Sequence, residues 1–195
     1  MSTINEKLAS ATVGIAGLGG LGSTVAAALT RAGIGRLIIA DFDKVEKSNL
    51  NRQHYFLHQL GQNKVDATTD NLCKINPDVK IQGHQLKLTA GNIPAIFAGA
   101  DIIAECFDKA DQKQMIVETV LTKMTDPIIV SASGLAGYGK SNDIITKRVS
   151  PRFILVGDNH SGIDSINFLA AARVWIAASH QANAILEVLI DEIKK

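Results

Sequence analysis

The stretch GLGGLG at residues 17–22 limits the folds open to this chain more than any other feature. A short apolar run, TVGIAG, precedes it at residues 12–17, and a helical pattern, LGSTVAAALTRAG, follows it and stops at Gly33. A G-x-G-x-x-G turn between a strand and a helix is typical of parallel α/β folds that bind a nucleotide phosphate. The sequence therefore predicts a strand–turn–helix unit with a phosphate site. A glycine-rich packing turn without a ligand is the simpler alternative.

Each glycine of this turn has its own expected role. Gly17 can make the tight turn, and Gly19 lets a ligand approach the backbone. Gly22 lets the helix lie close to the strand. The N-terminus of the helix offers free N–H groups and the positive end of its dipole to a phosphate. The glycines expected to line the cofactor site are Gly17, Gly19, Gly20 and Gly22.

Strand and helix signals alternate over the first 133 residues, which predicts right-handed crossovers and a mainly parallel sheet with helices on both faces. After them, DIITKRVS and RFILVGD predict an antiparallel pair, and a densely apolar pattern at residues 168–193 predicts a long buried helix. We expect one α/β domain over residues 1–195, with a Rossmann-like, doubly wound sheet, an antiparallel C-terminal annex and a long C-terminal helix. The strand signals lie at residues 12–17, 36–41, 79–86, 101–108 and 127–133, and the helix signals at residues 21–33, 63–76, 92–98 and 112–124.

Composition and charge exclude several classes of protein. The formal net charge of +1 gives no strong attraction to polyanions, and the chain lacks the basic stripe of a nucleic-acid binder. No apolar run approaches the roughly 18 residues of a membrane span, and no signal-peptide pattern is present, so we expect a cytoplasmic protein without a membrane partner. Cys73 and Cys106 lie in apolar-periodic segments and are expected to be reduced core thiols.

Polar side chains are dense after the second strand, in DFDKVEKSNLNRQ at residues 41–53. Asp41 ends that strand 19 residues after Gly22, where an acidic residue holds ribose hydroxyls in dinucleotide-binding folds. A nicotinamide-dependent dehydrogenase would need this carboxylate, but it does not explain the polar loop that follows. Ser48 in this loop fits the N-cap of a short helical turn.

Three further charged residues are expected at the same edge of the sheet. Arg52 lies in the polar loop, Lys64 opens the next helix, and Asp108 ends another parallel strand. Two cations and a carboxylate suit a polyphosphate with Mg²⁺. The alternative is a solvated loop with weak surface ion pairs, which is the better interpretation for any one of these residues but not for all of them together.

In combination these stretches resemble a known family. GLGGLGS is followed by DFDKVEKSNLNRQ, by K-x-D-A at residues 64–67 and by C-x-D at residues 106–108. This combination is similar to the ubiquitin-activating-enzyme-like adenylyltransferases of the ThiF and MoeB type. SASGLAGYGKSN at residues 131–142 and ARVWIAASHQAN at residues 172–183 extend the resemblance to nearly the whole chain. The short ThiF-type members of thiamine biosynthesis are the most similar.

The resemblance implies a role for each polar residue. Asp41 would hold the ribose of ATP. Asn49, Arg52 and Lys64 would bind phosphates, and the strand-end carboxylate would hold Mg²⁺. The cofactor-binding set also includes Asp43 and Gln53, and the residues expected to act in catalysis are Arg52, Lys64 and Asp108.

The implied reaction is adenylation of a protein carboxylate. The C-terminal carboxylate of a ubiquitin-like sulfur carrier ending in Gly-Gly, similar to ThiS, would attack the α-phosphorus of ATP and release pyrophosphate. Because that carboxylate is ionised at neutral pH, no general base is needed, and charge neutralisation and alignment dominate catalysis. A homodimer is expected, with Trp175 and its apolar neighbours in the core or at the dimer interface.

The chain departs from the family pattern at several places. It has no paired C-x-x-C motif, so no structural zinc is expected. Many relatives place an N-terminal arginine in the partner's ATP site, whereas the first arginine here is Arg31. A non-catalytic adaptor that binds a carrier or a nucleotide therefore stays open as an alternative. His54 and His58 could share a helix face, but without a third ligand they are expected to be structural or surface histidines.

Overall fold

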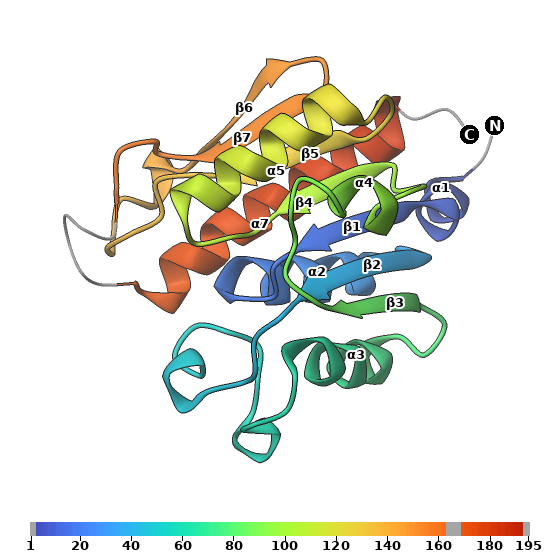
Figure 1. The fold of residues 1–195 in the computed structure, drawn as a ribbon. Coiled ribbons are helices and arrows are strands. Elements are labelled where there is room, and N and C mark those ends of the chain that lie inside the picture. The colour runs from blue at the N-terminus through green and yellow to red at the C-terminus, as the bar shows by residue number, and fades with distance from the viewer. Residues whose placement is uncertain (1–2, 163–168, 193–195) are drawn as a thin grey trace.

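A seven-stranded sheet organises the structure, a computed structural model that describes residues 3–162 and 169–192 (Figure 1). The strand order is β3-β2-β1-β4-β5-β7-β6, and each neighbouring pair is parallel except β6 with β7. This arrangement confirms the predicted Rossmann-like, mainly parallel sheet. The strands are β1 (Thr12–Ala16), β2 (Arg36–Asp41), β3 (Lys80–Gln85), β4 (Ile102–Glu105), β5 (Ile128–Ala132), β6 (Ile145–Ser150) and β7 (Phe153–Gly157).

Helices cover both faces of this sheet. In Figure 1, α4 and α5 lie in front of the sheet, and α2 and α7 lie behind it. Each face buries its own apolar cluster, as expected when crossovers alternate between the two sides. The helices are α1 (Ile4–Ser10), α2 (Gly20–Ala32), α3 (Lys64–Ile75), α4 (Ile93–Ile96), α5 (Ala110–Lys123) and α7 (Ala171–Glu187), which continues into a π-helical turn at Val188–Glu192.

The central strand β1 shows why these residues form the middle of the sheet. All five of its residues are buried, as a parallel strand covered on both faces requires. Val13 and Ile15 pack into the cluster shared with α2 and α7. On the other face a Cβ at Gly14 would lie 2.6 Å from the ring of Phe97, so this glycine admits a fully buried aromatic side chain.

The C-terminal part of the chain completes the same sheet. β6 and β7 pair in antiparallel fashion, which confirms the predicted pairing, and β7 also pairs in parallel with β5. The predicted annex is therefore an extension of the main sheet. The predicted C-terminal helix is present as α7, while its predicted ends Phe168 and Ile193 lie outside the described residues.

Two features differ from the sequence prediction. Helix α1 was not predicted, although Thr3 and Glu6 form the reciprocal capping box that starts it. Strand β4 ends at Glu105, so Asp108 lies in the turn at residues 106–109 and not at the strand end. The predicted strand was too long because Cys106 and Phe107 continue its apolar pattern. In the described part of the chain, no helix combines the length and apolar character needed to cross a membrane.

Candidate active site

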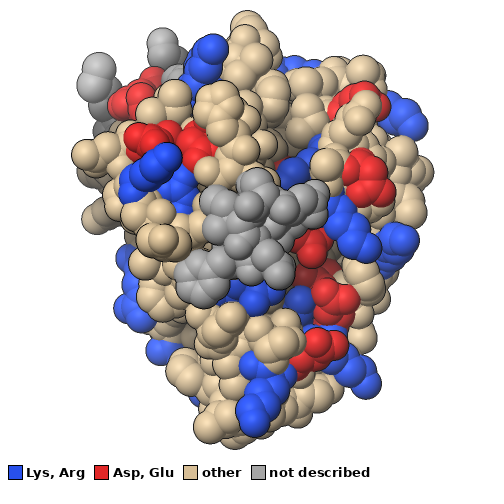
Figure 2. Space-filling view, turned by 90° about the vertical axis from the view of Figure 1, so that its left-hand side faces the viewer, with Lys and Arg blue, Asp and Glu red and all other residues tan. Residues whose placement is uncertain are grey.

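The carboxyl ends of the parallel strands lie on the left of Figure 1, and Figure 2 looks onto that edge. The strand order reverses between β1 and β4, and open α/β sheets bind ligands at this point. The glycine turn follows β1, and the turn that carries Asp108 follows β4. Acidic and basic side chains lie next to one another on this face in Figure 2, so a ligand that carries both an anion and a cation would find partners here.

The glycine turn is packed too tightly for side chains at two positions. Gly17 has a φ of +91°, and a Cβ there would lie 3.1 Å from the carbonyl oxygen of Cys106. A Cβ at Gly22 would lie 1.8 Å from the carbonyl oxygen of Gly17. Gly19 differs, because the nearest atom to a Cβ there is Nε2 of Gln53 at 3.8 Å. Gly19 also caps α2 without a side-chain hydrogen bond, which leaves the first N–H groups of the helix for an anion.

The glycine turn touches the segments that carry the predicted charged residues. A Cβ at Gly20 would lie 3.6 Å from Cγ of Arg52. A Cβ at Gly17 would lie 3.2 Å from the ring of Phe107, the residue before Asp108. The loop of Arg52 and the turn of Asp108 therefore lie on either side of the glycine turn.

Leu18, the second residue of the glycine turn, is held from both sides. Its N–H donates to Oδ2 of Asp41 at 2.6 Å, and its carbonyl accepts from the hydroxyl of Tyr55 at 2.8 Å. Since Tyr55 donates to Leu18, it accepts from the hydroxyl of Thr68, 3.0 Å away. Burial raises the pKa of Tyr55, so the phenol remains a donor at neutral pH. No sequence pattern marks Tyr55 for this role, and the sequence analysis missed it.

Asp41 ends β2, as the sequence predicts, and is buried. Its Oδ1 accepts the N–H of Asp43 at 2.8 Å, while its Oδ2 holds Leu18. Each carboxylate oxygen keeps a second lone pair that could accept a ribose hydroxyl. The side chain therefore supports the glycine turn and can also receive a ligand.

Lys64 and Asp43 form an ion pair that joins the start of α3 to the end of β2. Nζ of Lys64 lies 3.0 Å from Oδ2 of Asp43, and the Lys64 side chain is only 6% exposed. The backbone N–H of Lys64 also donates to the carbonyl of Asp43 at 3.0 Å. The ammonium group has two further N–H donors, which suit phosphate oxygens.

The loop after β2 contains a 3₁₀ turn at Lys47–Asn49. Glu46 is its N-cap residue, and Oδ1 of Asn49 accepts the N–H of Glu46 at 3.0 Å. The predicted N-cap role of Ser48 is therefore wrong, because the turn begins before Ser48 and contains it. Asn49 closes the turn with its side-chain oxygen, while its amide nitrogen lies 3.5 Å from the Ser48 hydroxyl.

Arg52 follows this turn and is held by short-range contacts. Its guanidinium donates to the carbonyl of Ser48 at 3.2 Å and to Oδ1 of Asn51 at 2.8 Å. Within the described residues it has no carboxylate partner, so its charge remains available for an anion. Its carbonyl accepts from Nε1 of Trp175 at 3.0 Å. Trp175 is 42% exposed and is not a core residue, because its indole N–H binds this surface loop.

Gln53 has a buried amide beside the glycine turn. Its side-chain oxygen has no hydrogen-bond partner among the described residues, whereas its Nε2 lies near Gly19. A buried polar atom without a partner destabilises a protein unless something else satisfies it. The position of Gln53 therefore fits a ligand that donates a hydrogen bond next to the glycine turn.

Asp108 is exposed in the turn between β4 and α5. It makes no hydrogen bond to any other described residue. A single exposed carboxylate beside a phosphate site fits Mg²⁺, which is commonly bound through one or two carboxylates together with phosphate oxygens and water.

The histidines have separate aromatic neighbours. The ring of His54 lies 5.3 Å from that of Trp175, and the ring of His58 stacks on Phe56 at 5.9 Å. Burial and then the charge of Arg31 lower the pKa of His54. Across residues 3–162 and 169–192, no group of three or more His, Cys, Asp or Glu residues could hold a metal ion by itself.

The two cysteines differ in environment. Cys106 is buried below the glycine turn, and burial raises the pKa of its thiol, so it is an unreactive core thiol. Cys73 is exposed on α3, so its predicted core position is wrong. It follows the buried Leu72 by one position, which is about 100° of rotation around a helix.

Arg173, from the first turn of α7, organises the loops that follow β5 and β7. Its buried guanidinium donates to the carbonyls of Ala136, Gly139 and Lys140. It also pairs with Asp158 at 2.5 Å. Burial alone would raise the pKa of Asp158, but hydrogen bonds from Ser161 and His160, together with the Arg173 charge, outweigh it and lower the pKa to about 2.

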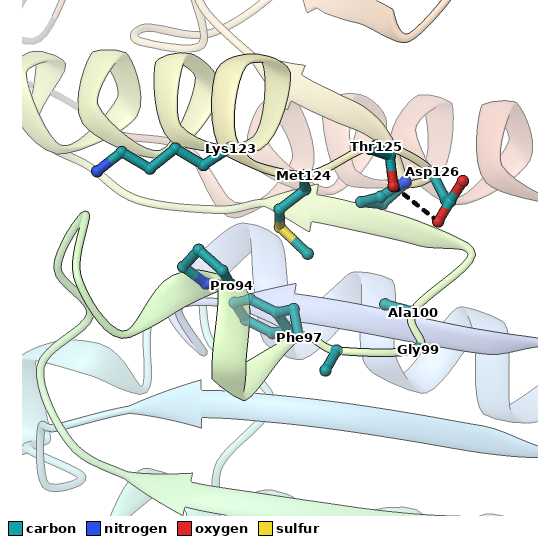
Figure 3. A pocket seen from close by; sticks show the side chains of 10 residues that line it. Pro94, Phe97, Gly99, Ala100, Lys123, Met124, Thr125 and Asp126 are labelled. Carbon is teal, nitrogen blue, oxygen red and sulfur yellow. Dashed lines mark hydrogen bonds between the residues drawn. The ribbon is translucent and has the colours of Figure 1, made fainter.

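A pocket of about 280 Å³ lies at the opposite edge of the sheet (Figure 3). Residues from α4, from the end of α5 and from the turns before β4 and β5 line it, including Phe97 and Met124. In Figure 3 the side chain of Lys123 points away from this group. The amino ends of β4 and β5 lie here, so the pocket is separate from the edge where the predicted site residues gather.

The sheet order and the glycine turn at its switch point define a Rossmann-like α/β protein with charged side chains at the carboxyl edge of the sheet. The family follows from the sequence, since the pattern of the ThiF family matches residues 2–192. The chain belongs to the ThiF family, within the ubiquitin-activating-enzyme-like adenylyltransferases that the sequence motifs resemble.

Relatives are found among the activating enzymes of ubiquitin-like modifiers. Ubiquitin-like modifier-activating enzyme 5 of Caenorhabditis briggsae is 38% identical over 122 residues, which is 57% of this chain and 28% of that protein. The enzyme of the same name from Caenorhabditis elegans is 47% identical over 91 residues, which is 46% of this chain and 22% of that protein. The chain spans less than a third of the length of these relatives.

Solved structures share the fold. E. coli tRNA N6-threonylcarbamoyladenosine dehydratase, TcdA, in complex with AMP superposes with a TM-score of 0.82 at 20% identity, covering 96% of this chain and 89% of that one. E. coli MccB with ATP gives a TM-score of 0.71 at 24% identity, covering 95% of this chain and 57% of that one. At these identities the likeness establishes the architecture alone.

Proposed function

We propose that this protein uses ATP to adenylate the C-terminal glycine carboxylate of a ubiquitin-like sulfur carrier of the ThiS type, in thiamine biosynthesis. The observation that carries the proposal is the set of groups around the glycine turn. The turn is held in place by Asp41 and Tyr55, the guanidinium-bearing Arg52 packs beside it, the buried ammonium of Lys64 pairs with Asp43 just after β2, and the exposed carboxylate of Asp108 follows β4. Solved structures of the same fold contain AMP or ATP, which supports an adenine nucleotide as the ligand.

In this proposal the nucleotide lies across the carboxyl edge between β1 and β4. The N-terminus of α2 binds the phosphates, and Asp41 accepts from the ribose. Arg52, Lys64 and Asn49 hold the phosphate oxygens around the α-phosphorus. Because the attacking carboxylate and the phosphates are both anionic, these cations lower the barrier by neutralising charge as the two approach.

Asp108 is the proposed Mg²⁺ ligand. The exposed, unbonded state of its carboxylate and its place after β4, next to the glycine turn, support this role. Mg²⁺ there would neutralise charge on the phosphates that leave as pyrophosphate.

The proposed partner is a small carrier with a flexible Gly-Gly end. The names of the relatives, which activate ubiquitin-like modifiers, support this substrate class. A tail without side chains can pass between closely spaced loops, and its terminal carboxylate needs no deprotonation by the protein. Thiamine biosynthesis and a ThiS-like carrier follow from the resemblance to short ThiF-type proteins.

A homodimer in the cytoplasm is part of this proposal. Helix α7 packs within its own protomer, so its apolar residues do not by themselves require a second copy. Better support comes from the loop between β2 and α3, where Phe42 is 58% exposed, Phe56 is 56% exposed and Leu57 is 71% exposed. A reducing compartment suits the exposed free thiol of Cys73. Sedimentation should show about twice the 20.8 kDa chain mass at micromolar concentration, and a monomer would contradict the dimer.

Carrier-dependent exchange of labelled pyrophosphate into ATP tests the reaction. Exchange should require the protein, Mg²⁺ and a carrier ending in Gly-Gly, and a carrier truncated by two residues is the matched control. Binding of ATP and carrier without exchange would favour the adaptor alternative. In parallel, Mg-ATP should raise the melting temperature more than NAD does, and the reverse order would favour a dehydrogenase.

A further inference from the structure

Glu105 is a fully buried carboxylate at the end of β4, three residues before Asp108. Its Oε1 accepts the backbone N–H of Phe107 at 2.6 Å. Both of its oxygens lie 3.1 Å from Nζ of Lys113 on α5, and its Oε2 accepts from the hydroxyl of Ser131 on β5. These contacts join the end of β4 to the turn that follows it, to α5 and to β5.

The contacts hold the turn at residues 106–109 from both of its ends. Phe107 lies in the turn, and Lys113 lies at the end of the first turn of α5, the helix that follows it. A single carboxylate therefore fixes the chain just before Asp108 and the helix just after it. The side chain of Asp108 itself has no bond to any described residue, so its position depends on this backbone.

Gln181 of α7 also supports the end of β4, from the face of the sheet that α7 covers. Its Nε2 donates to the carbonyl of Glu105 at 2.9 Å and to the carbonyl of Val130 at 3.1 Å. The last paired residues of β4 and β5 are Ala104 and Val130, so Gln181 bridges the two strands where their ladder ends. The end of β4 is thus fixed in the sheet, in the helix layer and in the turn.

We propose that Glu105 is a positioning residue for Asp108, which it places for metal binding through the N–H of Phe107 and the ammonium of Lys113. This inference rests on the proposed function, because it takes Asp108 as the metal ligand. A buried ion pair adds little net stability compared with an apolar pair of similar volume, so stability alone gives little reason for a charged pair here. Groups that orient a metal-binding carboxylate typically change metal affinity or activity about 10- to 100-fold when removed.

The test compares ATP binding with and without Mg²⁺ by calorimetry, in wild type, Asp108→Ala and Glu105→Gln. The quantity measured is the dissociation constant of ATP without Mg²⁺ divided by that with Mg²⁺, which reports how strongly the metal contributes to nucleotide binding. Glu105→Gln should reduce this ratio about 10-fold, towards the value of Asp108→Ala, with ATP affinity in the absence of Mg²⁺ nearly unchanged. A purely structural role would lower the melting temperature and leave the ratio as in wild type.

Two further variants keep the test decisive. Glu118→Gln makes the same chemical change on the exposed side of α5 and should behave as wild type. Lys113→Gln changes the partly exposed partner and should shift the ratio in the same direction as Glu105→Gln, even if the latter fails to fold.

A wild-type ratio in folded Glu105→Gln or in Lys113→Gln overturns the inference, as does a wild-type protein whose ATP affinity ignores Mg²⁺. If Mg²⁺ strengthens ATP binding and Glu105→Gln weakens that effect, the inference stands even where no carrier supports pyrophosphate exchange. In that case the proposed adenylation alone has failed.

Discussion

The two flanks of the carboxyl edge hold their candidate site residues in different ways. On the flank proposed to bind the nucleotide, the nucleotide flank, which runs from the turn after β1 through the end of β2 and its loop to the start of α3, Asp41 and Lys64 are buried and already bonded into the fold. On the flank proposed to face the carrier, the acceptor flank, which comprises the turn after β4 and the loops after β5 and β7, Asp108 is exposed and other residues make the supporting contacts. Substitutions on the nucleotide flank should therefore change stability and ligand binding together, whereas the acceptor flank should separate them.

The largest expected effect is that of Asp108→Ala on the acceptor flank. Loss of the carboxylate that we propose as the Mg²⁺ ligand should slow single-turnover formation of the carrier adenylate by about 100-fold or more. Its stability should stay within about 0.5 kcal/mol of wild type, because an exposed side chain without partners is removed. Rapid-quench kinetics and urea unfolding provide the two measurements. A wild-type rate in the folded variant would show that Asp108 is not the metal ligand.

Asp41→Asn should produce the mixed effect expected of the nucleotide flank. An amide in place of the carboxylate faces the N–H groups of Leu18 and Asp43 with one acceptor where there were two. We expect a loss of about 2 kcal/mol in unfolding free energy together with weaker ATP binding. Asp70→Asn is the control, since Asp70 is half exposed and forms a surface ion pair with Lys74. Full stability of Asp41→Asn would break the distinction between the two flanks.

Tyr55→Phe isolates the support of the glycine turn from any direct ligand contact. The buried carbonyl of Leu18 loses its donor, so the free energy of unfolding should fall by about 1–2 kcal/mol. Tyr138→Phe, at a side chain that is 75% exposed, is the matched change and should cost far less. ATP affinity should fall modestly in Tyr55→Phe. Equal stability of the two variants would show that the hydrogen bond from Tyr55 to Leu18 contributes little.

The smallest effect concerns acid stability of the acceptor flank. The pKa of Asp158 is lowered to about 2 in the folded protein, against an ordinary value of 3.8. Its contribution to stability is therefore complete above pH 3.8 and is lost as the pH falls towards 2. Urea unfolding between pH 5 and pH 2 should show a shallower decline in Asp158→Asn than in wild type. Parallel curves would show that Asp158 does not contribute to acid sensitivity.

Sequence patterns were most informative where burial dictates residue type. The apolar run at residues 36–41 predicts β2 with both ends correct, because a polar loop and Gly35 bound it. The glycine spacing predicts the turn after β1 because the backbone there leaves no space for a Cβ at Gly17 or Gly22. In these places local composition and tertiary environment point to the same structure.

The remaining features depend on contacts between segments far apart in the chain. Nothing local indicates that the carboxylate of Glu105 turns the chain at Phe107, so the predicted strand continues to Asp108. The anchor role of Tyr55 likewise depends on a carbonyl 37 residues away. Trp175 is an aromatic residue in an apolar stretch, which is typical of a core position, but its indole N–H binds a surface carbonyl 123 residues earlier.

The indole of Trp175 also determines the fluorescence of the protein. Trp175 is the only tryptophan in the chain, so all of the indole fluorescence comes from one place. There α7 contacts the carbonyl of Arg52 through the indole N–H. An anion bound by Arg52 would change the electric field at this fluorophore and shift its emission maximum. Protonation of the adjacent His54 would quench it. The protein thus contains a label-free reporter for occupancy of the proposed phosphate site at Arg52.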